Sequence, residues 1–238
     1  MLLFFYYTML FMLFASLASF FMLVGSRTVH HQSFIHGRSK CDHCQVTISP
    51  LALIPILGYL LTTGKCSNCD QQIPLIYPIC EGFFAVFTLL LFQNQSLETS
   101  MMLFISFSLL LIMTSADLAV QQIPDRFQAI FLLLVICYIL QVPNFPIFTH
   151  SIFSLLVVTT FILCNYILHQ GIGGGDIKTL AILALLLGPM SFSYLLLLAS
   201  GLAICHVMYL KIKKTNLPKG LPFLPYLFFA YPIIFYIL

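Results

Sequence analysis

Residues 101–118 read MMLFISFSLLLIMTSADL, an apolar run with a single carboxylate, Asp117, near its end. About 20 helical residues cross the roughly 30 Å hydrocarbon core of a bilayer, so this run is long enough to span a membrane. A backbone in lipid must satisfy its own hydrogen bonds, which favours helices. Similar apolar runs cover residues 1–25, 74–92, 129–142, 150–168, 178–188, 190–210 and 221–238. The sequence therefore predicts an all-α polytopic membrane protein with about eight transmembrane helices.

The composition supports this prediction. The chain has 238 residues, of which 61% are hydrophobic and only 7% are charged, whereas a soluble domain has about 25% charged residues. We therefore expect the lipid bilayer to be the main partner of the surface, and no nucleic-acid partner. We see no internal repeat. One polar insertion divides the chain into a first transmembrane helix (1–25), an insertion (26–73) and a membrane domain (74–238).

The basic residues predict the orientation of these spans. With eight spans, all ten Lys and Arg fall on one side of the membrane, and the loops on the other side carry none. The positive-inside rule makes the basic side cytoplasmic and places both termini outside. No basic residue precedes the first run, so we expect a retained span and not a signal peptide. The ten basic residues are Arg27, Arg38, Lys40, Lys65, Arg126, Lys178, Lys211, Lys213, Lys214 and Lys219.

Four cysteines in the insertion have the spacing of a zinc site. Cys41 and Cys44 form one CxxC pair, and Cys66 and Cys69 form a second. Two such pairs supply four thiolates that can coordinate one metal ion tetrahedrally. Four sulfurs fill the coordination shell, so we predict a small, zinc-ribbon-like module with a structural metal. A redox CxxC pair and unligated thiols are the alternatives, although a cytoplasmic location disfavours structural disulfides.

Carboxylates within membrane spans are expensive and indicate function. Asp117 ends the third predicted span, and Asp176 follows Gly173, Gly174 and Gly175 at the start of the sixth, so both lie at cytoplasmic helix ends. Two adjacent carboxyls that share a proton can act as base and acid, as in aspartic proteases. The glycines would let an extended peptide approach the backbone. The alternatives are that Asp176 caps a helix and that Asp117 sits at a hydrated helix end.

Several strings together resemble those of the bacterial type IV prepilin peptidases, which belong to the GxGD class of intramembrane aspartic proteases. They are KCDHCQVTISPLALIPILGYLLTTGKCSNCDQQIPLIYPICE at 40–81, DLAVQQIPD at 117–125 and IGGGDIK at 172–178. The first span and the short cysteine loop are most similar to the competence-pseudopilus enzymes of Gram-positive bacteria.

This resemblance implies a site and a reaction. Asp117 and Asp176 would be the catalytic pair, Gly173–Gly175 and Lys178 would approach the substrate, and the four cysteines would bind zinc. The enzyme would cleave a short basic leader, after a glycine, from type IV pilin-like precursors at the cytoplasmic face of the bacterial plasma membrane.

The resemblance also implies methyl transfer. Many family members methylate the new N-terminal amine with S-adenosylmethionine, and Arg27 and Glu81 match family positions. For Glu81, methyl transfer and packing are both open interpretations. The family's first motif commonly reads Ser-Phe-x-Asn, whereas Phe21 and Met22 follow Ser19 and Phe20 here, so the Asn of this motif is absent.

Two other functions fit parts of the pattern. Intramembrane acids also bind protons or cations in transporters, which often show two similar halves. Presenilin-like and signal-peptide-peptidase-like proteases share the GxGD chemistry but usually lack the cysteine insertion.

Overall fold

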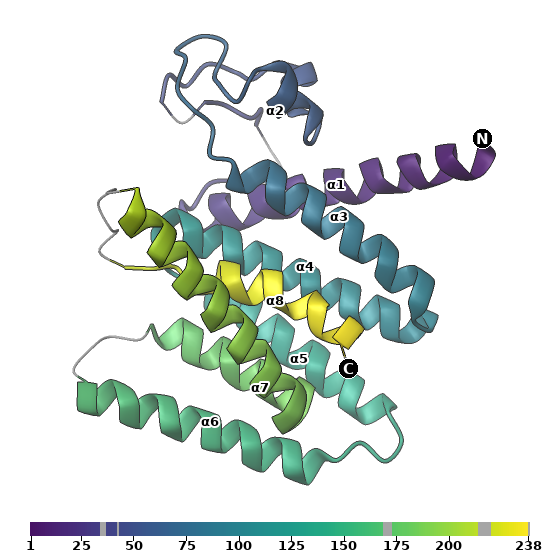
Figure 1. The fold of residues 1–238 in the computed structure, drawn as a ribbon, viewed down its shortest axis with the longest axis vertical. Helices are drawn as coiled ribbons and strands as arrows, with labels where there is room; N and C mark the ends of the chain where they lie inside the picture. The colour runs from purple at the N-terminus through teal and green to yellow at the C-terminus, as the bar shows by residue number, and fades with distance from the viewer. Residues whose placement is uncertain (34–36, 42, 169–172, 214–219, 238) are drawn as a thin grey trace. The chain divides into compact units, whose positions relative to one another are not determined.

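Helices form nearly all of the regular structure in the residues that the computed structural model describes, which are 1–33, 37–41, 43–168, 173–213 and 220–237 (Figure 1). In chain order they are α1 (Leu2–Val29), a short 3-10 helix η1 (Pro50–Leu53), α2 (Leu57–Leu61), α3 (Ile76–Asn94), α4 (Leu97–Val120), α5 (Asp125–Gln141), α6 (Ile147–Leu168), α7 (Gly174–Ile212) and α8 (Leu224–Ile237). The predicted all-α class is confirmed.

Among the described residues, five helices are long and apolar enough to cross a membrane, namely α1, α3, α4, α6 and α7. The length criterion therefore yields fewer spans than the eight predicted. Two causes explain the difference. α5 and α8 have 17 and 14 residues, and the predicted spans 178–188 and 190–210 are both contained in α7.

A sharp bend divides α7 at the position where the sequence predicts a break. Gly188 has φ 71° and ψ −179°, a backbone conformation that is essentially restricted to glycine, and Pro189 follows it. In Figure 1 the chain reverses direction here, so that both ends of α7 lie at the same end of this part of the molecule. The imidazole of His150, near the start of α6, packs against Gly188 and bonds to the carbonyl oxygen of Leu185 at 2.9 Å.

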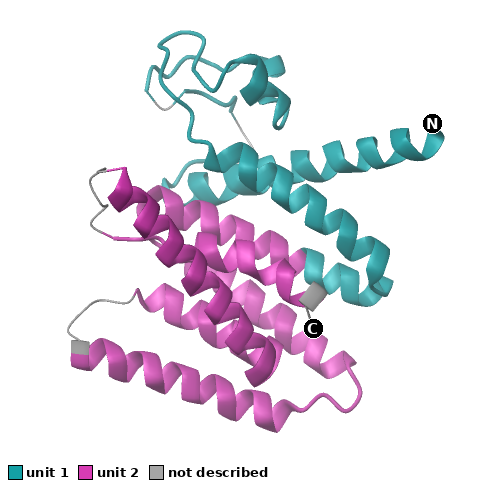
Figure 2. Ribbon diagram, viewed as in Figure 1, with its two compact units in different colours: residues 1–104 teal, residues 105–238 magenta. Residues whose placement is uncertain are grey.

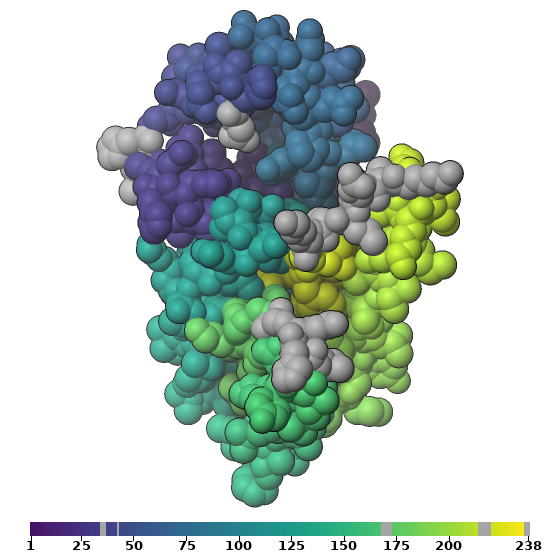
Figure 3. Space-filling model, turned by 90° about the vertical axis from the view of Figure 1, so that its left-hand side faces the viewer, coloured from purple at the N-terminus to yellow at the C-terminus, as the bar shows by residue number. Residues whose placement is uncertain are grey.

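The chain forms two compact units, residues 1–104 and 105–238 (Figure 2). This boundary lies inside α4 and differs from the predicted segments 1–25, 26–73 and 74–238, which stay a sequence-based division. In the first unit, α1 packs against α3 through a cluster of Phe14, Phe84, Phe92 and Phe104. The insertion is seen in blue at the top of Figure 3, and it runs from the end of α1 at Val29 to the start of α3 at Ile76.

In the second unit, α7 packs against α5, α6 and α8. Phe107 of α4 stacks on Phe228 of α8 with ring centroids 4.7 Å apart. Beside this stacked pair, the hydroxyls of Ser106 and Tyr231 hydrogen-bond at 2.7 Å inside the core. These contacts fix α8 along α4, so that the first turn of α8 reaches the end of α4 that carries Asp117.

Candidate active site and metal centre

Asp117 and Asp176 line one cavity of about 320 Å³ in the second unit. Asp117 lies in the last turn of α4 and Asp176 in the first turn of α7, 59 positions apart in the chain but close enough for their charges to interact. The remaining lining comes from the α4–α5 connection and the start of α7, and consists of Gln121, Gln122, Ile123, Asp125, Gly173, Gly174 and Gly175. The structure thus brings together the two aspartates that sequence spacing alone could not connect.

The carboxyl group of Asp117 is held by the start of α8. Its side chain is 4% exposed, and Oδ2 accepts the backbone N–H of Leu224 at 3.2 Å. First-turn N–H groups have no partner within their own helix, so a carboxylate is a favourable acceptor for them. Asp117 is therefore a buried residue at its helix end, and the first turn of α8 sets the orientation of its carboxyl group.

Asp176 is placed differently from a helix cap. The N-cap of α7 is Gly173, which has no side chain to form a cap, and Asp176 is the third helical residue. Its Oδ1 atom is buried and, within the described part of the chain, has no hydrogen-bond partner. A buried oxygen without a partner in the cavity is available to a water molecule or a substrate.

The three glycines serve different purposes. A Cβ atom on Gly175 would lie 3.0 Å from the side chain of Ile123, so this glycine permits close contact between α7 and the α4–α5 connection. A Cβ on Gly173 would lie 3.2 Å from Oδ2 of Asp176, whereas a Cβ on Gly174 would point into open space. Gly174 is thus the glycine with room for an approaching peptide.

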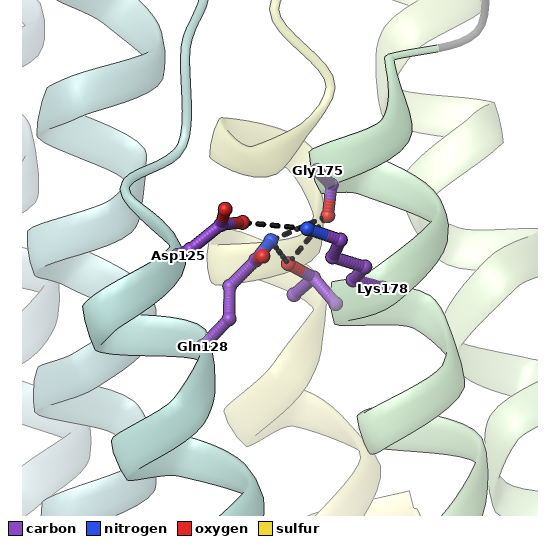
Figure 4. A network of polar contacts seen from close by, with 5 residues as sticks. Asp125, Gln128, Gly175 and Lys178 are labelled. Atoms are coloured by element: carbon purple, nitrogen blue, oxygen red, sulfur yellow. Dashed lines mark hydrogen bonds and ion pairs between the residues drawn. The ribbon is translucent and has the colours of Figure 1, made fainter.

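A polar network joins the first turns of α5 and α7. Figure 4 shows Lys178 reaching Asp125, with Nζ 2.6 Å from Oδ1, and Gln128 pointing at Gly175. Lys178, which the sequence analysis assigned to substrate approach, therefore has an acidic partner in its own chain. Asp125, Gln128 and Leu224 were not selected from the sequence, because nothing in their spacing indicates contacts with segments that are distant in the chain.

The four predicted metal ligands come together. The sulfurs of Cys41, Cys44, Cys66 and Cys69 all lie within 4.8 Å of one another, with Cys41–Cys69 and Cys44–Cys66 separations of 3.8 Å. A zinc ion with four sulfurs at about 2.3 Å requires sulfur–sulfur edges of about 3.8 Å. The geometry of these side chains therefore fits a tetrahedral thiolate site.

The two CxxC pairs lie in two separate small hairpins that have the same hydrogen-bond pattern. An isolated bridge pairs Lys40 with Thr47, and another pairs Lys65 with Gln72. Inside them, the N–H of Cys41 donates to the carbonyl of Val46 and the N–H of Cys66 to that of Gln71, 25 residues later in each case. The insertion thus contains an internal repeat, and the prediction of no internal repeat is wrong. The repeat was not visible in the sequence because few residues besides the cysteines match.

Backbone donors and crowding act on the thiols in opposite ways. The backbone N–H of Val46 lowers the pKa of Cys44, and the N–H groups of Asn68 and Cys69 lower the pKa of Cys66 to about 6. Gln71 acts in the same direction on Cys69, but burial and the sulfurs of Cys44 and Cys66 outweigh it and raise the pKa of Cys69 to about 12. A cation among the four sulfurs would favour the thiolate form of each cysteine and replace the remaining protons.

Glu81 and Arg27, the residues associated with methyl transfer, have separate sets of partners in the first unit. Oε2 of the buried Glu81 accepts the N–H of Ile56 at 2.9 Å, and Ser19 of α1 is also hydrogen-bonded to this carboxyl. Ile56 has φ 61° and ψ −52°, a strained turn for a β-branched residue. Arg27 donates to the carbonyl of Ser33 at 3.0 Å. Glu81 thus holds the insertion against α1 and α3.

Comparisons with known proteins match both parts of the chain. The profile of the bacterial peptidase A24 N-terminal domain matches residues 12–95, and the profile of the type IV leader peptidase family matches residues 104–208. A prepilin leader peptidase/N-methyltransferase of Bacillus subtilis (strain 168) is 33% identical over 177 residues, which cover 72% of this chain and 70% of the relative.

Two further relatives carry the same name. The protein of Vibrio cholerae serotype O1 is 29% identical over 210 residues, covering 84% of this chain and 81% of the relative. That of Pseudomonas putida is 30% identical over 218 residues, covering 87% and 75%. No solved structure matches the chain.

Proposed function

The chain belongs to the type IV leader peptidase family, and we propose that it is an aspartic endopeptidase that removes the basic leader from type IV pilin-like precursors. Family membership sets aside the transporter and the presenilin-like protease as alternatives. The observation that carries the proposal is the shared cavity of Asp117 and Asp176, which joins the two motifs in one site.

The catalytic step is a hydrolysis by two carboxyl groups that share one proton. The ionised member takes a proton from a water molecule as the water oxygen attacks the carbonyl carbon of the leader glycine. The protonated member gives its proton to the carbonyl oxygen. When the tetrahedral intermediate collapses, the C–N bond breaks, the leaving amine receives the proton taken from water, and one hydroxyl of the intermediate returns its proton to the carboxylate that acted as the acid. Oδ1 of Asp176, which has no hydrogen-bond partner among the described residues, and the open side of Gly174 support this use of the cavity.

We propose eight membrane crossings, with the catalytic pair near the cytoplasmic face of the bacterial plasma membrane. In the second unit, the end of α4, the start of α5, both ends of α7 and the start of α8 share one end. Arg126, Lys178, Lys211 and Lys213 belong to these helix ends, and Lys214 and Lys219 lie outside the described residues. In the first unit, the basic residues belong to the end of α1 and the insertion. This distribution follows the positive-inside rule.

The four cysteines would hold a structural zinc ion. Their separations match a tetrahedral site, and four sulfurs leave no position for a water molecule, so the metal would fasten the two hairpins together and take no part in hydrolysis. Metal analysis of the purified protein checks this proposal.

N-methylation of the new N-terminus is a second activity that the comparisons support, because the relatives carry N-methyltransferase in their names. S-adenosylmethionine would be the methyl donor. Arg27 and Glu81 stay candidates for this step, and the contacts of Glu81 with Ser19 and Ile56 give it a structural role as well.

Purified protein incubated with a type IV prepilin tests the main proposal. We expect a product whose mass, measured by mass spectrometry, corresponds to cleavage directly after the leader glycine. A matched precursor in which this glycine is replaced by a bulky residue is the control and should stay intact. An intact wild-type precursor, or cleavage of both precursors at another position, would contradict the proposed function.

A further inference from the structure

We propose that Gln128 is a positioning residue that holds the first turn of α7, and with it Asp176, in place for catalysis. The proposal rests on the proposed function of Asp176. Gln128 itself does not touch the reacting atoms and acts through Gly175, the residue that directly precedes Asp176.

Gln128 makes two contacts from α5 to α7. Its Nε2 atom donates to the carbonyl oxygen of Gly175 at 2.7 Å and to Oγ1 of Thr179 at 3.0 Å, and the Thr179 hydroxyl also donates to the Gly175 carbonyl at 3.0 Å. Figure 4 shows the amide of Gln128 directed from α5 at Gly175. The three groups form a closed triangle. Gln128 is 4% exposed and Thr179 is fully buried, so water cannot replace these bonds readily.

The first turn of α7 needs an outside support because of its sequence. Gly173, Gly174 and Gly175 precede Asp176, and glycine is among the poorest helix formers because it loses the most backbone freedom on folding. A helix start built from glycines would fray, and the carboxyl of Asp176 would move with it. Gln128 binds this segment one residue before Asp176, and Ile123 packs against Gly175 from the side. The segment is thus held from two directions by the α4–α5 connection and α5.

The neighbouring ion pair contributes much less to this positioning. Lys178 and Asp125 approach to 2.6 Å, but their side chains are 58% and 78% exposed. Exposed ion pairs contribute little to the stability of a fold. Their electrostatic attraction is weak in water, and the entropy lost on ordering two mobile side chains opposes it. The buried amide, and not the ion pair, is therefore the contact that should set the geometry.

Kinetics of four variants test the proposal. Gln128→Met keeps a long side chain but has no donor, and we expect kcat for prepilin cleavage to fall about tenfold or more while KM stays within about twofold. Thr179→Val should show a smaller loss of kcat than Gln128→Met. Thr179→Ser keeps the hydroxyl and should have a kcat close to that of the wild type. Gln141→Met, at the exposed far end of α5, is the matched control and should behave as the wild type.

Hydrogen exchange of the purified protein provides a readout that needs no activity. Gln128→Met should speed exchange in the first two turns of α7, residues 174–180, with no change in α3. Faster exchange throughout the second unit, or loss of folded protein with an unchanged kcat per folded enzyme, would indicate a general structural role and overturn the proposal. An unchanged kcat in Gln128→Met together with unchanged exchange would also overturn it. A wild-type protein that cleaves no prepilin would instead contradict the proposed function, while the exchange result would still decide whether Gln128 holds the turn.

Discussion

Individual buried carboxylates in this protein accept N–H groups from distant parts of the chain. Asp117 accepts the N–H of Leu224, at a separation of 107 residues, and Glu81 accepts the N–H of Ile56, at a separation of 25. A buried N–H that loses its partner costs about 1–3 kcal/mol. Each of these bonds therefore fixes a loop or a helix start to a span, and its loss should be measurable as a loss of stability.

Glu81 gives a direct test at the scale of one residue. Glu81→Ala leaves the N–H of Ile56 and the hydroxyl of Ser19 without this partner, and we expect the melting temperature in detergent to fall by several degrees, at about 2–4 °C per kcal/mol. Glu81→Gln keeps an acceptor oxygen at the same position and should stay much closer to the wild type. If alanine and glutamine variants both melt like the wild type, the contact does not hold the insertion.

Residue type and spacing were sufficient to select the cysteines and the two aspartates as candidates, since thiolate pairs and intramembrane carboxylates are rare without a purpose. Gln128 and Leu224 could not be found in this way. The first contributes an amide and the second only its backbone N–H, and both act through contacts that exist only after α5, α7 and α8 have packed.

Among the elements, α7 depends on a single glycine for its shape. Gly188 combines a positive φ with an extended ψ, and a Cβ atom at this position would lie 2.5 Å from Nε2 of His150. The sequence predicted a break here from Gly188-Pro189, and Gly188 is the non-helical residue between the two helical arms of α7. Only the packing of α6 against the bend shows why glycine is needed.

Gly188→Ala should therefore destabilise the second unit. Backbone strain of about 1–3 kcal/mol adds to the steric overlap with His150, so we expect the melting temperature to fall by about 5 °C or more. Gly201→Ala is the matched control in the same helix. Its Cβ would meet open space, and alanine is the better helix former, so it should be neutral or stabilising. Equal melting temperatures for the two variants would show that the bend does not require glycine.

At the scale of the whole molecule, the helical class and the membrane character follow from composition and from the lengths of the apolar runs. The number of helices that pass a length criterion does not follow from the sequence. The sharply bent α7 and the 17-residue α5 both differ in length from an ideal membrane span. The cavity could not be predicted either. It requires the end of α4 and the beginning of α7 to meet, and these segments are separated by a long stretch of chain.

The central claim is that Asp117 and Asp176 act as one catalytic pair. Initial rates of prepilin cleavage by Asp117→Asn, Asp176→Asn and the double variant test it most directly, with Glu98→Gln at the opposite end of α4 as the control. Asparagine fills the same volume but cannot carry the proton, so each single variant should lose about a thousandfold or more in kcat. Because the two groups work as a unit, the double variant should be no slower than either single one, with all proteins present in the membrane at similar levels. Cleavage at a tenth or more of the wild-type rate by either single variant would contradict the claim.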